Sequence, residues 1–169
     1  MQRFRRQSHC GENNDNEIDH FLYHPSQNTM RGITCSTPLG CLIIPLSSDF
    51  SDQLQTEISD YFHGRRYTFS TNLLQAAEKV VFSIGTPFQQ SVWRALMQIP
   101  YASTITYSDL AQRIGNPRAT RAVAAACRAN PFPILIPCHR VVAKNDIGGF
   151  ALGIPAKQLL LRLESAHSR

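Results

Sequence analysis

Residues 106–129, TYSDLAQRIGNPRATRAVAAACRA, decide the fold that we expect for this chain. Thr106 with Asp109 forms a capping pair for a short helix, and Gly115 ends that helix. Asn116-Pro117 then caps and begins a second helix. A helix, a short glycine-containing turn and another helix form the pattern of a helix-turn-helix.

The second helix of the pair, expected over residues 118–129, has one basic stripe with little bulk when it is projected at 100° per residue. Its arginines are Arg118, Arg121 and Arg128, and small alanines separate them. Small side chains let a helix approach a DNA groove closely while arginines reach phosphates or bases. The alternative is an alanine-rich solvated helix with ordinary surface arginines.

The net charge of +5 is distributed unevenly along the chain. Residues 1–85 hold seven Lys and Arg against nine Asp and Glu, a balance of −2, whereas residues 86–169 hold ten against three, a balance of +7. Arginine supplies 14 of the 17 basic residues, which favours phosphate recognition. A nucleic-acid surface is therefore expected in the second half.

A further helix is expected directly before the pair, because residues 86–89 combine a capping box with proline at the first helical position. Pro100 ends this helix, whose apolar face holds Phe88, Val92, Leu96 and Ile99. A last helix begins at Ile154-Pro155, and its core-facing residues are expected to be Leu159, Leu160 and Leu163. Residues 86–169 should thus form the main domain.

The first half of the chain is less regular. Residues 1–30 are rich in Asn, Gln, Ser and acids and lack apolar periodicity, which predicts a flexible tail. Residues 31–85 should form a short α/β domain with a strand at 41–44 and a helix at 51–62. The β-branched run at 79–83 predicts another strand within an irregular connection.

A candidate nucleophile stands in Pro137-Cys138-His139-Arg140, after the apolar run Ile134-Leu135-Ile136. We expect this run to be a buried strand that Pro137 ends, so that Cys138 lies in a turn facing a pocket. A thiol reacts as thiolate, and its surroundings decide how much thiolate exists. A quiet buried thiol is the alternative, and zinc is disfavoured because adjacent Cys and His lack the usual spacer.

Glu164 lies near the end of the last helix, where the helix dipole does not favour an acid. A salt bridge would explain it, and so would a carboxylate that orients a histidine.

Five cysteines without paired spacing predict free thiols in a reducing compartment. The basic N-terminus lacks the apolar segment of a secretory signal, and no apolar run approaches the roughly 20 residues that span a bilayer. We therefore expect a cytoplasmic protein without membrane contact.

A metal site could be imagined in the first part of the chain, formed by His9, Cys10, His20, His24 and Cys35. The spacings between these residues match no known zinc pattern, so we do not expect a metal there.

Residues 86–164 resemble the active-site domain of the O6-alkylguanine-DNA alkyltransferases, also called methylated-DNA–protein-cysteine methyltransferases. The most specific stretch is residues 130–142, NPFPILIPCHRVV, and the resemblance covers about half of the chain. TPLG at 37–40 and YFHG at 61–64 are similar to the family's N-terminal domain, more weakly. The resemblance implies an abridged, ribonuclease-H-like α/β N-terminal domain and a mostly α, winged-helix-like C-terminal domain.

The family's chemistry implies DNA repair in a single turnover without a cofactor. An alkyl group would move irreversibly from O6 of guanine to Cys138, while His139 takes the thiol proton through a water. Glu164 would fix the histidine tautomer, and Asn130 would brace the turn.

The family's binding mode implies a monomer that holds double-stranded DNA with alkylated bases and flips the damaged base into the pocket. Arg121 would fill the space that the base leaves, Tyr107 would help to turn the nucleotide, and the guanine edge would be read by backbone groups at Cys138, Val141, Phe150 and Ala151. Ala151 stands where some members carry a serine, and the stretch between Gly40 and Tyr61 is shorter than the family pattern.

Three other functions are compatible with parts of this pattern. A non-catalytic alkylated-DNA-binding protein of the same fold would keep the DNA surface but not a reactive thiol. A helix-turn-helix transcription factor would bind one sequence, usually as a dimer. A cysteine hydrolase would normally take its base from elsewhere in the chain, and no hydrolase signature accompanies this cysteine.

Overall fold

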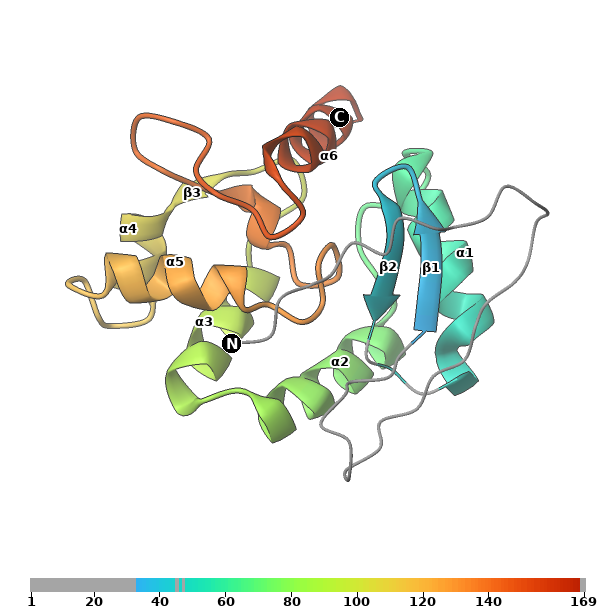
Figure 1. Ribbon diagram of the computed structural model, residues 1–169, viewed down its shortest axis with the longest axis horizontal. Coiled ribbons are helices and arrows are strands. Elements are labelled where there is room, and N and C mark those ends of the chain that lie inside the picture. Colours follow the sequence, from blue (N-terminus) through green and yellow to red (C-terminus); the bar gives the residue numbers. More distant parts are fainter. Residues whose placement is uncertain (1–32, 45, 47, 168–169) are drawn as a thin grey trace. The chain divides into compact units, whose positions relative to one another are not determined.

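The computed structural model describes residues 33–44, 46 and 48–167 (Figure 1), and it divides into two compact units, Met1–Arg66 and Tyr67–Arg169. The tail expected over residues 1–30 lies outside the described residues. The division falls before residue 85, where the sequence led us to end the first domain. The boundary falls earlier because the helix over residues 71–84 belongs to the second unit.

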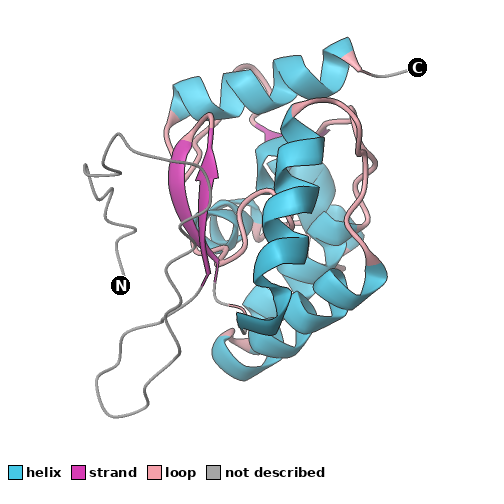
Figure 2. Cartoon of the chain, turned by 90° about the vertical axis from the view of Figure 1, so that its right-hand side faces the viewer, coloured by secondary structure: helices cyan, strands magenta, loops and turns pink. Residues whose placement is uncertain are grey.

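The first unit contains a β-hairpin and a helix. β1 (Ile33–Thr37) pairs with β2 (Gly40–Ile44) in antiparallel register, and Figure 2 shows this hairpin in magenta. After the short 3-10 turn η2 (Ser48–Phe50), α1 (Ser51–Phe62) packs against β1. The strand at 41–44 and the helix at 51–62 are confirmed, and β1 is an element that the sequence analysis did not predict.

The second unit begins with α2 (Thr71–Ile84), where we predicted an irregular connection and a strand at 79–83. That prediction is wrong. Leu73, Ala77 and Val81 recur every four residues and are all buried, so one apolar helical face is formed. The β-branched run at the end of this helix raises local strand propensity, but the helical period outweighs it.

Three helices carry the helix-turn-helix. α3 (Pro87–Met97) and α4 (Tyr107–Arg113) each begin with the predicted capping box, and α5 (Thr120–Arg128) packs on both. α5 begins later than predicted, because Pro117 lies in a turn that the hydrogen bond from the Ala119 N–H to the Asn116 carbonyl closes. Trp93 is buried in this core and donates its indole N–H to the Ala126 carbonyl at 2.9 Å.

The stretch before the candidate nucleophile is not the predicted strand. Residues 131–136 form turns, in which Ile134 has a φ of 77° and the Ile136 N–H donates to the Phe132 carbonyl. A positive φ is incompatible with an extended strand, so the apolar run is buried as a compact turn. Cys138 then opens the 3-10 turn η3 (Cys138–Arg140).

A pair of two-residue strands and a helix complete the unit. β3 (Ile105–Thr106) pairs in parallel with β4 (Val141–Val142). This pairing joins the start of α4 to the end of η3. α6 (Ile154–Ala166) follows, with Leu160 buried as predicted but Leu159 41% exposed. Its buried face holds Lys157, Leu160 and Glu164. Among the described residues, no helix has the length and apolar character needed to cross a membrane.

The junction between α2 and α3 predicts a stability effect at Gly85. A Cβ at this position would lie 2.5 Å from Cζ3 of the Trp93 ring, which cannot easily move. Gly85→Ala should therefore lower the free energy of unfolding by about 1–3 kcal/mol in urea titrations.

Gly149→Ala is the matched control, because a Cβ there meets no atom within 4 Å. Its effect should stay within about 0.5 kcal/mol. Equal stability of the two variants would contradict close packing of Gly85 on Trp93.

Candidate active site

Cys138 is held by a side chain that follows the end of α5. Its side chain is 3% exposed, and the Asn130 amide Nδ2 donates to Sγ at 3.1 Å. The same amide donates to the Ile136 carbonyl at 2.7 Å and its Oδ1 accepts from the Phe132 N–H at 3.0 Å. Asn130 thus bonds both the turn and the thiol, and its bracing role, which the family resemblance implies, stays a prediction.

His139, the residue after the thiol, is fully buried and pairs with Glu164 from α6. Its Nε2 lies 2.8 Å from Oε1 of the carboxylate. An ionised carboxylate accepts hydrogen bonds only, so Nε2 carries the proton and Nδ1 has the lone pair in the neutral ring. This pair connects α6 to η3.

Arg140 completes a buried charged cluster that the sequence analysis did not predict. Its Nε donates to both carboxylate oxygens of Glu164, at 3.1 and 3.0 Å, and its Nη2 donates to Oε1 at 2.8 Å. Its Nη1 donates to the Ile99 carbonyl at 2.7 Å. The position of Glu164 is therefore explained by both roles considered for it, a salt bridge and contact with a histidine.

Burial controls the protonation of these groups. It raises the pKa of the Cys138 thiol to about 11, against the opposing effects of the Asn130 hydrogen bond and the Lys157 charge. Burial also lowers the pKa of His139, which is therefore neutral at pH 7. Although burial alone would raise it, hydrogen bonds from His139 and Arg140 hold the pKa of Glu164 at about 2. A protonated thiol thus lies beside a neutral imidazole and a carboxylate.

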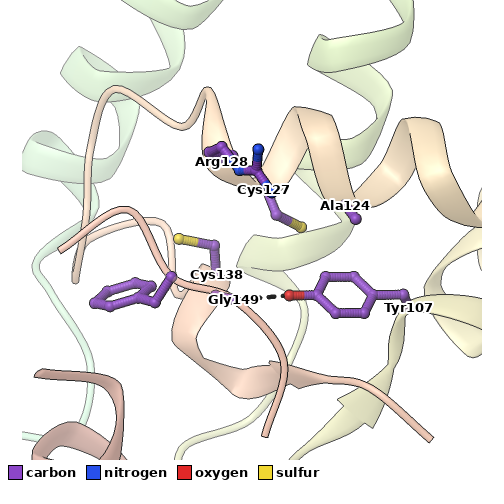
Figure 3. Close-up of a pocket in the computed structure, with 7 residues that line it drawn as sticks. Tyr107, Ala124, Cys127, Arg128, Cys138 and Gly149 are labelled. Atoms are coloured by element: carbon purple, nitrogen blue, oxygen red, sulfur yellow. Dashed lines mark hydrogen bonds between the residues drawn. The ribbon is translucent and has the colours of Figure 1, made fainter. Parts of the chain in front are cut away.

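Cys138 opens onto a cavity of about 80 Å³. Figure 3 shows Cys127, Arg128 and Ala124 on α5 along one side, with the Tyr107 ring from α4 approaching Gly149. Phe150 also lines the cavity, and its ring lies edge-on to His139 at 6.3 Å. The expected residues Tyr107, Arg128 and Phe150 are thus brought to the thiol.

Lys157 is a second buried cation that the sequence analysis missed. Its Nζ donates to the Val141 and Gly149 carbonyls, and Gly149 also accepts from the Tyr107 hydroxyl at 3.2 Å. Burial raises the pKa of Tyr107 to about 12, so its hydroxyl remains a donor. The spacing of Lys157, Leu160 and Glu164 along one helical face was a usable signal.

The predicted basic stripe lies on the surface. Arg121, Ala125 and Arg128 are exposed on α5, Arg118 is exposed just before it and Ala129 just after it. The opposite face, with Val123, Ala126 and Cys127, is buried. The helix therefore presents arginines and small side chains outward, as its projection predicted.

Two further expected binding residues, Val141 and Ala151, lie close to the residues that line the cavity. Val141 is buried, and its carbonyl accepts from Lys157, which leaves one lone pair of that oxygen for another donor. Ala151 follows Phe150 without itself lining the cavity.

Of the imagined metal set, only Cys35 is described, and the described residues contain no cluster of three or more potential metal ligands.

Comparisons with known proteins agree on one relationship. The family model described as the DNA binding domain of 6-O-methylguanine DNA methyltransferase matches residues 87–166. A methylated-DNA–protein-cysteine methyltransferase of Methanosarcina acetivorans is 41% identical over 121 residues, which are 71% of this chain and 72% of that protein. A probable enzyme of the same name from Acanthamoeba polyphaga mimivirus is 53% identical over 85 residues, 50% of this chain and 57% of that protein.

Solved structures of O6-methylguanine methyltransferases are also similar to this chain. The O6-methylguanine methyltransferase of Mycobacterium tuberculosis aligns with a TM-score of 0.64 at 29% identity, and the alignment covers 80% of this chain and 93% of that chain. The Mycobacterium tuberculosis protein in complex with DNA aligns with a TM-score of 0.65 at 30% identity, over 80% of this chain and 92% of that chain.

The contact between Asn130 and Cys138 predicts a change in thiol reactivity. Asn130→Ala removes a hydrogen bond that lowers the pKa of Cys138, so less thiolate should form. Labelling of Cys138 by iodoacetamide at pH 8, followed by peptide mapping, should slow roughly three- to tenfold.

The exposed Asn116→Ala is the control and should label at the wild-type rate. If a folded Asn130→Ala protein also labelled at the wild-type rate, this hydrogen bond would not set the reactivity of the thiol.

Proposed function

Because this chain belongs to the methylated-DNA–protein-cysteine methyltransferase family, we propose that it repairs DNA by moving an alkyl group from O6 of guanine to Cys138. One observation carries the proposal most directly. The Cys138 thiol lines a cavity, contacts Asn130 and is followed in the chain by a histidine paired with a buried carboxylate. These are the groups that a displacement by sulfur requires.

The first step removes the thiol proton. With a pKa of about 11, Cys138 is protonated near neutral pH and needs a base. His139 is neutral and donates from Nε2 to Glu164, so the proton would arrive at Nδ1 through a water. Glu164 would then stabilise the imidazolium that forms.

The second step is a direct displacement. The Cys138 sulfur forms a bond to the alkyl carbon while the bond from that carbon to O6 breaks, and the electron pair stays on oxygen. The guanine then takes up one proton, so that the net products are S-alkylcysteine and unmodified guanine. A thioether is a poor leaving group, and each molecule is therefore used once.

Access to the alkyl group requires the damaged base to leave the duplex, because enzymes that modify a base cannot reach it within the stack. The exposed face of α5 suits the groove, with Arg121 filling the vacated space and Arg118 and Arg128 at the phosphates. Tyr107 and the backbone at residues 138, 141, 150 and 151 would contact the flipped nucleotide.

The finer architecture and setting belong to the same proposal. We assign an abridged ribonuclease-H-like fold to the first domain and a winged-helix-like fold to the second, supported by the likeness to the Mycobacterium tuberculosis structures. The protein would act as a monomer on alkylated double-stranded DNA in the cytoplasm. Free Cys35, Cys127 and Cys138 fit such a reducing compartment.

The transfer itself is testable by intact mass. Incubation with a duplex containing one O6-methylguanine should add the mass of one methylene, saturating at one per molecule, because methyl replaces the thiol hydrogen. Peptide mapping should place the added mass on Cys138.

Cys138→Ala is the control and should gain no mass while still binding the duplex. If the wild-type protein bound the damaged duplex without any mass gain, the chain would instead be a non-catalytic alkylated-DNA-binding protein.

The α5 surface is testable by salt dependence. Arg118→Ala and Arg128→Ala should each weaken DNA binding and reduce the slope of log K against log salt by about 1, since each removes one phosphate contact. Fluorescence anisotropy with an unmodified duplex measures both quantities.

Arg162→Ala removes an exposed arginine of α6 and serves as the control. An equal loss of slope in this control would argue for diffuse charge attraction rather than binding through α5.

A further inference from the structure

We propose that Arg140 is a positioning residue for the transfer, which fixes the Glu164 carboxylate against the His139 ring and balances its charge. This inference rests on the proposed function. Arg140 would touch neither DNA nor the reacting atoms, because its guanidinium is directed to Glu164 and the Ile99 carbonyl.

The first argument is that the carboxylate is held from two directions. Oε1 of Glu164 accepts from His139 at 2.8 Å and from Arg140, while Oε2 accepts from Arg140 and from the Ala102 N–H at 3.0 Å. Rotation of the carboxylate would break bonds on both oxygens. The plane of the carboxylate, and with it the direction of the bond to His139, is therefore set by Arg140 and Ala102.

The second argument is that Arg140 is itself anchored. The residue is 7% exposed, its Nη1 donates to the Ile99 carbonyl at 2.7 Å, and its guanidinium lies 5.6 Å from the centre of the Tyr101 ring. Ala102, next in the chain, has a φ of 57°, a conformation that non-glycine residues rarely adopt. The segment after α3 thus supplies a ring, a carbonyl and an N–H around the ion pair.

The third argument concerns charge. The charged or titratable groups that act on His139 are Glu164, Arg140 and Lys157. Glu164 favours the imidazolium, whereas Arg140 and Lys157 disfavour it. Burial is the main cause of the low pKa of His139, and Arg140 adds to it by pairing the carboxylate, so His139 enters the reaction as a neutral base. Without Arg140, the carboxylate would be unbalanced and would favour the imidazolium more strongly, so that less neutral base would be left for the thiol near neutral pH.

The experiment compares the full chain with Arg140→Met, which removes the charge, and Arg140→Lys, which keeps it without the bidentate geometry. The second-order rate of methyl transfer from an O6-methylguanine duplex is measured by intact mass from pH 5 to 9. Iodoacetamide labelling of Cys138 over the same range gives a readout that is independent of DNA. Circular dichroism checks that each variant is folded.

We expect the acid limb of both profiles to move to higher pH by about one unit in Arg140→Met, because the pKa of His139 rises. Arg140→Lys should keep the wild-type limb but transfer several-fold more slowly, since one ammonium cannot hold both oxygens. In a Glu164→Gln background, Arg140→Met should cause a smaller shift, because no carboxylate is left to balance and only the direct repulsion between Arg140 and the imidazolium is lost. Arg162→Met, on an exposed site of α6, should match the wild type.

A folded Arg140→Met protein with the wild-type acid limb in both profiles would overturn the proposal. Should Arg140→Met fail to fold, as loss of one partner of a buried ion pair can cause, a shifted limb in Arg140→Lys would equally contradict it. Failure of the proposed function looks different, because the wild type would then transfer no methyl group while its labelling profile still tests Arg140.

Discussion

The hydrogen bonds that the buried Glu164 carboxylate accepts are the interaction on which the second unit depends. It receives hydrogen bonds from η3 through His139 and Arg140 and from the segment after α3 through Ala102. Three stretches that are distant in the sequence are thus joined at one buried charge on α6. A buried carboxylate is costly unless it is paired and hydrogen-bonded, and here every partner is a donor. The same bonds that stabilise the charge also aim the histidine.

Burial gives this site its chemical character. A thiol with a pKa of about 11 holds very little thiolate at neutral pH, and the thiolate is the reactive form. Reactivity then depends on removing the proton at the moment when an electrophile is present. His139 is available to accept it, because the same burial lowers the pKa of the ring and keeps the ring neutral. Burial thus raises the pKa of the thiol and lowers the pKa of the imidazole, so the proton stays on sulfur in the resting protein.

Local signals explain what could be predicted from the sequence. The helices beginning at residues 87 and 107 were predictable because their capping boxes are contained within four residues. The turn at residues 131–136 was not, because it depends on the Asn130 side chain and on the positive φ of Ile134 rather than on apolar content. The burial of Arg140 and Lys157 was not predicted because charged residues are usually solvated, and only the helical spacing of Lys157 and Glu164 hinted otherwise.

The 3-10 turn η3 has a consequence for how this site tolerates change in length. A 3-10 helix has about three residues per turn, so successive side chains diverge by roughly 120°. Cys138, His139 and Arg140 therefore reach the cavity, the carboxylate and the segment after α3 from one turn of backbone. One inserted or deleted residue would rotate all three away from their partners together. Substitutions at this site act on one group at a time, whereas a change in register would remove the nucleophile, the base and the counter-charge in one event.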